Sequence, residues 1–182
     1  MARFIALLTF LLSLSSTPAA ATSVLYLTDR EQAQQSDAVV LATITDQRVE
    51  RHPVWNRPTT ISTVRVDEVL HGTAPAEFEL HQLKGELDGT TTELPGSANI
   101  EKGERVVLFT HVVEGRWYPT ALQQSKYSVH QTRLGLLLAR KPLEADLYTR
   151  APDGALEPIE EPPRKPIYTL DELRKALAGL KE

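Results

Sequence analysis

The sequence of 182 residues contains no cysteine. A chain without thiols can form neither disulfides nor a cysteine-ligated metal site, and it has no thiolate nucleophile. The same absence excludes the acylated cysteine of a lipoprotein. Stability must therefore come from burial of apolar surface, which one domain of this length can provide.

Recognisable catalytic motifs are also missing. The chain has no GxSxG elbow, no SxxK pair and no HxH or HExxH zinc motif. The histidines are His52, His71, His81, His111 and His130. Three of them, His81, His111 and His130, lie on predicted strands, so a metal site would have to be assembled across strands. We predict no catalytic residue, metal or cofactor, and the alternative is a metal-dependent hydrolase with such a histidine cluster.

Positive charge is not in excess. The sequence has 20 Lys and Arg against 24 Asp and Glu, a net charge of -4 at pH 7. This balance gives no bulk attraction to nucleic acid or to anionic lipid, and no basic stripe with interleaved aromatic residues occurs. We therefore expect no nucleic-acid partner.

The N-terminus has the pattern of a secretory signal peptide. Arg3 is followed by an apolar run over residues 4–14, which is shorter than the roughly 20 residues of a membrane span. The small residues at 19–21 suit signal peptidase, and they predict cleavage between Ala21 and Thr22. We expect residues 1–21 to be removed and the protein to be periplasmic or extracellular, without a stable membrane anchor.

The remaining chain is predicted to be mainly β. A capping box at Thr28 and Glu31 predicts a short helix over residues 29–36. At least five segments have the alternating or continuous apolar pattern of strands: residues 37–45, 59–70, 77–81, 105–113 and 126–131. Glu114 and Gly115 form a two-residue turn that predicts a hairpin from the strand 105–113 into residues 116–119. On the strand 77–81, Phe78 and Leu80 should point inward and His81 outward. Short turns between the strands predict a small antiparallel barrel within residues 22–133.

The C-terminal part is less regular. Residues 134–151 contain apolar runs that fit either strand or helix, and residues 152–168 form a linker rich in proline and acidic residues. A second capping box, Thr169 with Glu172, opens an amphipathic helix within residues 169–182. In one interpretation this linker and helix are the interaction element, and the barrel is only a scaffold.

Two loops are the surfaces on which a partner is expected. Residues 84–103, rich in glycine, proline and threonine, are either functional or contain short strands. Residues 50–58 should project from the barrel, and a tryptophan on a proline-stiffened loop suits a binding anchor. The candidate partner-binding residues are His52, Val54, Trp55, Asn56 and Arg57. The alternative is that the indole folds back over the end of the barrel.

Four segments in order resemble a known family. They are SDAVV at 36–40, VDEVLHG at 66–72, FEL at 78–80 and KGERVVLF at 102–109. Together these motifs, within residues 29–130, resemble the netrin-like module and the inhibitory domain of tissue inhibitors of metalloproteinases. The resemblance implies a five-stranded OB-fold barrel with helices packed at its ends. It does not imply protease inhibition, because those inhibitors place a disulfide-bonded N-terminal cysteine on the protease zinc.

The sequence thus predicts an exported, non-enzymatic OB-fold module that binds a protein or peptide partner through its loops. OB barrels also bind oligosaccharides, so a sugar ligand stays open as an alternative. The oligomeric state is not indicated by any pattern in the sequence.

Overall fold

The computed structural model describes residues 23–133, 135–141, 146–159 and 168–180, and in these ranges the chain is mainly β with two short helices. The helices are α2 (Asp29–Gln34) and α3 (Leu170–Leu177), with a 3-10 turn η1 (Leu122–Ser125). The strands are β1 (Ser23–Leu25), β2 (Ala38–Arg51), β3 (Pro58–Gly72), β4 (Glu77–Gln82), β5 (Lys84–Leu87), β6 (Thr90–Glu93), β7 (Arg105–Val113), β8 (Arg116–Pro119), β9 (Lys126–Thr132), β10 (Gly135–Ala139), β11 (Asp146–Arg150), β12 (Leu156–Pro158) and β13 (Tyr168–Thr169).

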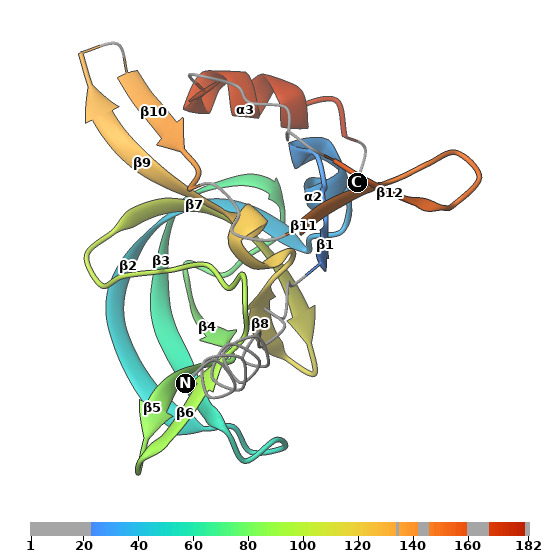
Figure 1. The fold of residues 1–182 in the computed structure, drawn as a ribbon. Coiled ribbons are helices and arrows are strands. Elements are labelled where there is room, and N and C mark those ends of the chain that lie inside the picture. Colours follow the sequence, from blue (N-terminus) through green and yellow to red (C-terminus); the bar gives the residue numbers. More distant parts are fainter. Residues whose placement is uncertain (1–22, 134, 142–145, 160–167, 181–182) are drawn as a thin grey trace, which may run out of the picture.

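Three sheets are formed, and the largest has eight strands rather than the five that were predicted. Its order is β13-β10-β9-β7-β2-β3-β4-β8, and β7 also pairs with β8 (Figure 1). The pairings of β2, β3, β4, β8 and β7 therefore form a ring. The predicted strand over 126–131, now β9, lies outside this ring and pairs with β7, while β8 takes the fifth place.

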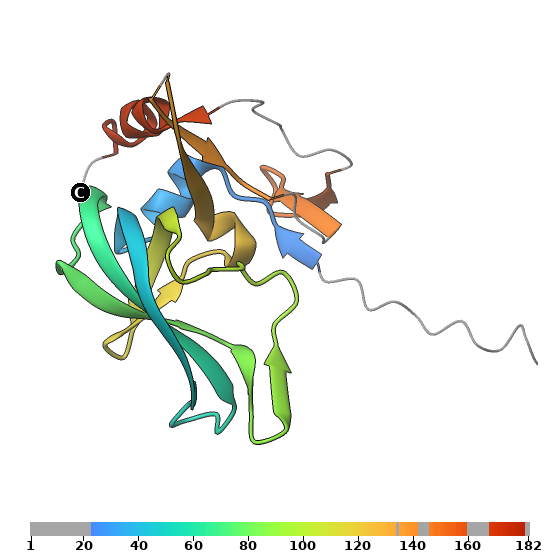
Figure 2. The same cartoon turned by 90° about the vertical axis from the view of Figure 1, so that its left-hand side faces the viewer.

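The strand pairs that form the ring differ greatly in length. The hairpin of β2 and β3 runs from the pair Ala38 and Gly72 to the pair Arg51 and Pro58, with three register shifts. Such bulges bend a strand and increase its twist, and Figure 2 shows the two long strands curving together. In contrast, β4 and β8 meet in parallel through one pair, Leu80 with Trp117.

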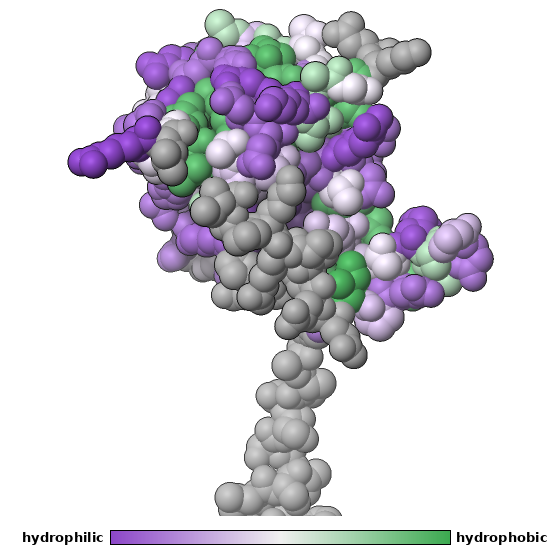
Figure 3. Space-filling view, turned by 90° about the horizontal axis from the view of Figure 1, so that it is seen from above, coloured by the Kyte–Doolittle hydropathy of each residue, from purple (hydrophilic) through white to green (hydrophobic). Residues whose placement is uncertain are grey.

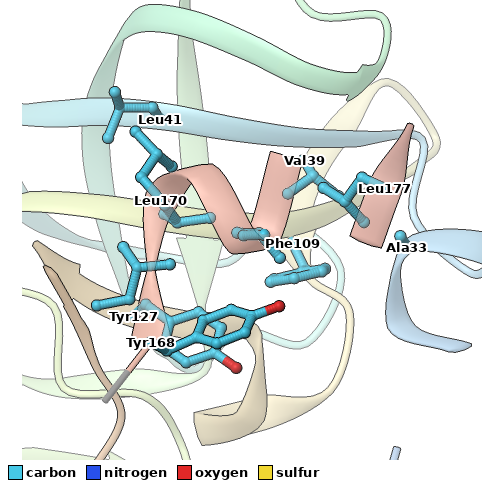
Figure 4. Packing of buried hydrophobic residues seen from close by; sticks show 11 residues of the cluster. Ala33, Val39, Leu41, Phe109, Tyr127, Tyr168, Leu170 and Leu177 are labelled. Atoms are coloured by element: carbon cyan, nitrogen blue, oxygen red, sulfur yellow. The ribbon is translucent and has the colours of Figure 1, made fainter. Parts of the chain in front are cut away.

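Two hydrophobic clusters lie on opposite faces of the same strands. One receives side chains from every strand of the ring, including Val40, Val64 and Leu108, with Trp117 partly buried against it. The other contains Phe109 and the residues that cover it (Figure 4). The predicted strand over residues 105–113 is present as β7, which pairs with β2, β8 and β9 and contributes to both clusters.

Both predicted capping boxes are present. Thr28 and Glu31 open α2, which ends two residues earlier than expected, and Thr169 and Glu172 open α3. The leucines of α3 that face the sheet are Leu170, Leu173 and Leu177, and all three are buried in the second cluster. On the described part of the face that α3 covers, hydrophilic side chains predominate (Figure 3). The apolar side of α3 is thus already occupied by its own chain.

The irregular segments contain short strands. Residues 84–103 include the separate hairpin of β5 and β6, at the opposite end of the molecule from the helices (Figure 1). The ambiguous segment 134–151 holds β10 and β11, and residues 156–158 of the predicted linker form β12, which pairs with β11. The predicted signal peptide 1–21 and linker residues 160–167 lie outside the described residues. No helix within the described ranges is long and apolar enough to span a membrane.

Candidate functional site

The loop between β2 and β3 comprises residues 52–57, shorter than the predicted 50–58. It is shorter because Glu50 and Arg51 still pair with β3. Two backbone hydrogen bonds close it, from His52 N to Arg57 O and from Asn56 N to His52 O, both 2.8 Å long. Asn56 has a φ of 50°, in the left-handed region that asparagine tolerates better than most residues. The loop is therefore a defined turn.

The side chain of His52 organises this loop from inside. Its Nδ1 accepts hydrogen bonds from the amides of Val54 and Trp55, at 3.2 and 3.4 Å. Because an amide can only donate, Nδ1 carries no proton in this arrangement, and the proton of the neutral ring is on Nε2. Nε2 therefore donates to the Tyr118 hydroxyl, 3.1 Å away.

The exposure of the five predicted partner-binding residues is uneven. His52 is only 4% exposed, because the loop folds around its ring. Val54 and Trp55 are 66% and 47% exposed, and Asn56 and Arg57 are also exposed. Four of the five residues are thus accessible, and the fifth supports them.

Trp55 was predicted either to be an exposed binding anchor or to fold back on the protein, and it has features of both. Its indole stacks on the His52 ring, with centroids 4.0 Å apart and 16° between the planes. It also lies at a tilt beside Tyr118, with a centroid distance of 6.4 Å. One face of the indole is therefore held by the protein, and nearly half of the side chain remains open to a partner.

Tyr118 is the point at which histidines from distant segments meet. The rings of His81 on β4 and His111 on β7 lie 5.7 and 6.0 Å from the Tyr118 ring, in addition to the contact with His52. His81 was predicted to face outward, but it is only 9% exposed. Its side chain packs with Tyr118 at this end of β4. His130 is exposed on β9 and does not join them.

We name this region the loop site: loop 52–57 together with His81, His111, Arg116 and Tyr118. The described residues include no group of three or more His, Asp or Glu side chains with a geometry that could hold a metal ion. His81 and His111 lie beside the Tyr118 ring, and His52 forms a hydrogen bond with its hydroxyl. The loop site thus offers aromatic surface and hydrogen bonds, and not a ligand set.

A groove of about 170 Å³ opens beside the loop. It is lined by Arg48, Glu50, Arg51, His52, Pro53, Thr59, Ile61, Glu79, His81 and Arg116. Pockets that hold drug-sized ligands have volumes of roughly 300–1,000 Å³, so this groove has room for about one side chain.

Most charges of the groove already have partners. Arg48 forms ion pairs with Glu50 and Glu79, at 2.6 and 2.8 Å. Arg51 forms one with Asp88, at 3.0 Å. The guanidinium of Arg116 has neither an ion pair nor a hydrogen bond with a residue that the structure describes.

Burial sets the ionisation of the aromatic and histidine side chains. It lowers the pKa of His52 below 6.5, and the positive charge of Arg116 lowers it further. Burial likewise lowers the pKa of His81 and raises that of the Tyr118 hydroxyl. At neutral pH these three rings are uncharged.

The second predicted surface, residues 84–103, borders another groove, of about 250 Å³. Its polar side chains are engaged within the protein. The Gln47 amide donates to Ile100 O, the Gln82 amide to Ala98 O and Lys84 Nζ to Asn99 Oδ1. The loop site therefore has more unused binding capacity than this second groove.

The chain matches no protein-family model, no curated protein and no solved structure.

Proposed function

We propose that this chain is an exported, non-enzymatic binding module of netrin-like OB type, which engages a protein or peptide partner through the loop site. The half-exposed Trp55, already fixed on His52, is the observation that carries this proposal. Tryptophan is enriched among the residues that dominate interface energies. An anchor that is ordered before binding loses little conformational entropy when the partner arrives.

The strand pairings support the OB interpretation. In chain order the ring strands are β2, β3, β4, β7 and β8, so the fifth strand lies between the third and the fourth. OB folds are five-stranded Greek-key barrels, and they bind ligands on the face of the second and third strands, near the loops 1–2 and 4–5. Here the corresponding elements are β3 and β4, loop 52–57 and the turn of Glu114 and Gly115. The groove is lined by residues of β3, β4 and loop 52–57, and by Arg116, which follows that turn.

Exposed apolar side chains extend the surface around Trp55. Val54 belongs to the same loop, and Val113 lies opposite Arg116 in the hairpin of β7 and β8. Both valines are exposed. A partner that contacts both loops would bury these side chains together with the indole, which suits a protein segment better than a small polar ligand.

Export belongs to the same proposal and rests on the apolar run at residues 4–14 and the small residues at 19–21. The alternative of a metal-dependent hydrolase has no supporting group of ligands among the described residues.

Site-specific photo-crosslinking in the producing cells tests the proposed function. A photoreactive phenylalanine analogue replaces Val54, and the matched control carries it at Leu156 on β12, which is similarly exposed. We expect a discrete protein adduct from position 54 that Trp55→Ala removes and that position 156 does not give. The same adduct from both positions, or one unaffected by Trp55→Ala, would contradict the proposal.

A further inference from the structure

Among the described residues Arg116 has no counterion, whereas the other arginines of its groove are paired. Its side chain is partly buried at the start of β8, directly after the turn of Glu114 and Gly115. Arg48 and Arg51 use the nearby carboxylates of Glu50, Glu79 and Asp88. Among the described charged residues that line the groove, Arg116 is the one without an ion pair, so its positive charge is available to an incoming group.

The surroundings of Arg116 favour an anion. His52 and His81 line the same groove, and both are neutral at neutral pH. A partly desolvated guanidinium gains strongly from charge-assisted hydrogen bonds, and a carboxylate can accept two of them at once. Arg57, exposed on the adjacent loop, adds a second positive charge on a chain whose net charge is -4.

The volume of the groove limits the kind of molecule that can carry this anion. About 170 Å³ accommodates one acidic side chain and not a chain of sugar rings. The neighbouring surface, formed by Val54 and Trp55, is apolar and exposed. His52 lines the groove together with Arg116 and stacks on Trp55, so a carboxylate on Arg116 and an apolar side chain on Trp55 would belong to neighbouring residues of an extended protein segment.

We propose that the loop site selects a protein segment in which an acidic residue, bound by Arg116, is adjacent to an aromatic or large aliphatic residue that packs on Trp55. This inference rests on the proposed function, because it specifies the partner of the same site.

Fluorescence anisotropy with synthetic peptides tests this selectivity. The probes are labelled eight-residue peptides of Gly and Ser with a central Phe-Glu, Glu-Phe, Phe-Gln or Gln-Phe pair, added to the purified chain. We expect one of the two acidic peptides to bind about tenfold more tightly than its glutamine counterpart, the difference that one charged hydrogen bond supplies. Arg116→Gln should remove that difference, and Trp55→Ala should weaken both peptides.

Arg30→Gln is the matched control, since it removes the same charge from an exposed position on α2, outside the loop site. It should leave the preference for glutamate within about twofold, because exposed charges contribute little. Circular dichroism of each variant verifies that the fold is retained.

The outcomes separate this inference from the proposed function. If both acidic peptides bind no more tightly than their glutamine counterparts but binding needs Trp55, the inference is wrong and the proposed function stands. Polygalacturonate serves as an acidic-sugar probe. If it is the only probe that binds, and its binding needs Arg116, the site recognises an acidic sugar and the inference is wrong. If no probe binds and position 54 gives no adduct, both proposals fail.

Discussion

The imidazole of His52 lies flat against the indole of Trp55, 4.0 Å from centroid to centroid, and its Nδ1 accepts the Trp55 amide hydrogen. One side chain therefore holds both the backbone and the ring of the proposed anchor. Protonation of His52 Nδ1 removes the acceptor of these hydrogen bonds, so the loop conformation depends on whether the His52 ring is charged.

Acid should release the loop. The pKa of His52 is lowered in the fold, so its contribution to stability is present above the ordinary pKa of about 6.5. That contribution is lost as the pH falls through the lowered pKa. The charges that act on the ring are those of Arg116, which lowers the pKa, and Glu114, which raises it. Tryptophan fluorescence of a Trp117→Phe variant, in which Trp55 is the only reporter, should change with a midpoint below pH 6.5.

The control for this titration is His52→Asn in the same background. The asparagine Oδ1 can accept the loop amides at any pH, so the fluorescence transition should disappear. A transition of unchanged midpoint in this variant would assign it to another group, of which His81 is the nearest titratable one at the Tyr118 ring.

The two tryptophans should differ in their effect on stability. Trp117 packs on Phe78, with ring centroids 4.7 Å apart, so Trp117→Ala should lower the free energy of unfolding by about 3 kcal/mol. Trp55→Ala loses one partly exposed stacking contact and should cost about 1 kcal/mol. Urea unfolding measures both, and equal losses would mean that Trp55 is a core residue.

Gly72 should not tolerate a side chain. Its φ is +70°, and an added Cβ would lie 2.0 Å from the carbonyl oxygen of Asp37. We expect Gly72→Ala to destabilise the fold by at least about 3 kcal/mol. Gly89 has the same φ with nothing within 4 Å, so Gly89→Ala should cost only about 1 to 2 kcal/mol. Thermal unfolding of the two variants separates the steric clash from the backbone strain.

The N-cap of α3 should contribute measurably to stability. Thr169 accepts the Glu172 amide, and the Glu172 carboxylate accepts the Thr169 amide. Thr169→Ala should therefore lower the free energy of unfolding by about 1 kcal/mol, and Thr169→Ser should restore most of it. If chemical denaturation finds Thr169→Ala unchanged, the cap has no role in holding α3 on the sheet.

Local sequence patterns predicted where the helices and strands lie better than they predicted which strands pair. The capping residues Thr28 and Thr169 and the strand 105–113 were found because their signals lie within a few adjacent residues. The sequence did not show that β8, and not β9, belongs to the ring, since pairing partners across a sheet leave no local signal. Alternation placed His81 outside, and only the packing of Tyr118 on that face explains its burial.

The candidate site was predicted only in part. Trp55 and its loop stood out because an apolar ring between prolines is unusual on a surface. The hydrogen bond from His52 to Tyr118 joins residues 66 positions apart, and no spacing rule reveals such a contact. Arg116 gave no sequence signal either, because whether it has a partner among the described residues depends on where the carboxylates lie in space.

At the join between β4 and β8, the ring has a single backbone pair, Leu80 with Trp117. The short strand β8 carries both Arg116 and Tyr118, and its backbone pairs mainly with β7. Across the join to β4 the contacts are between side chains: Trp117 packs on Phe78, and Tyr118 lies beside His81. Aromatic packing therefore takes the place of a backbone ladder at this point, and it sets the position of the strand that carries Arg116.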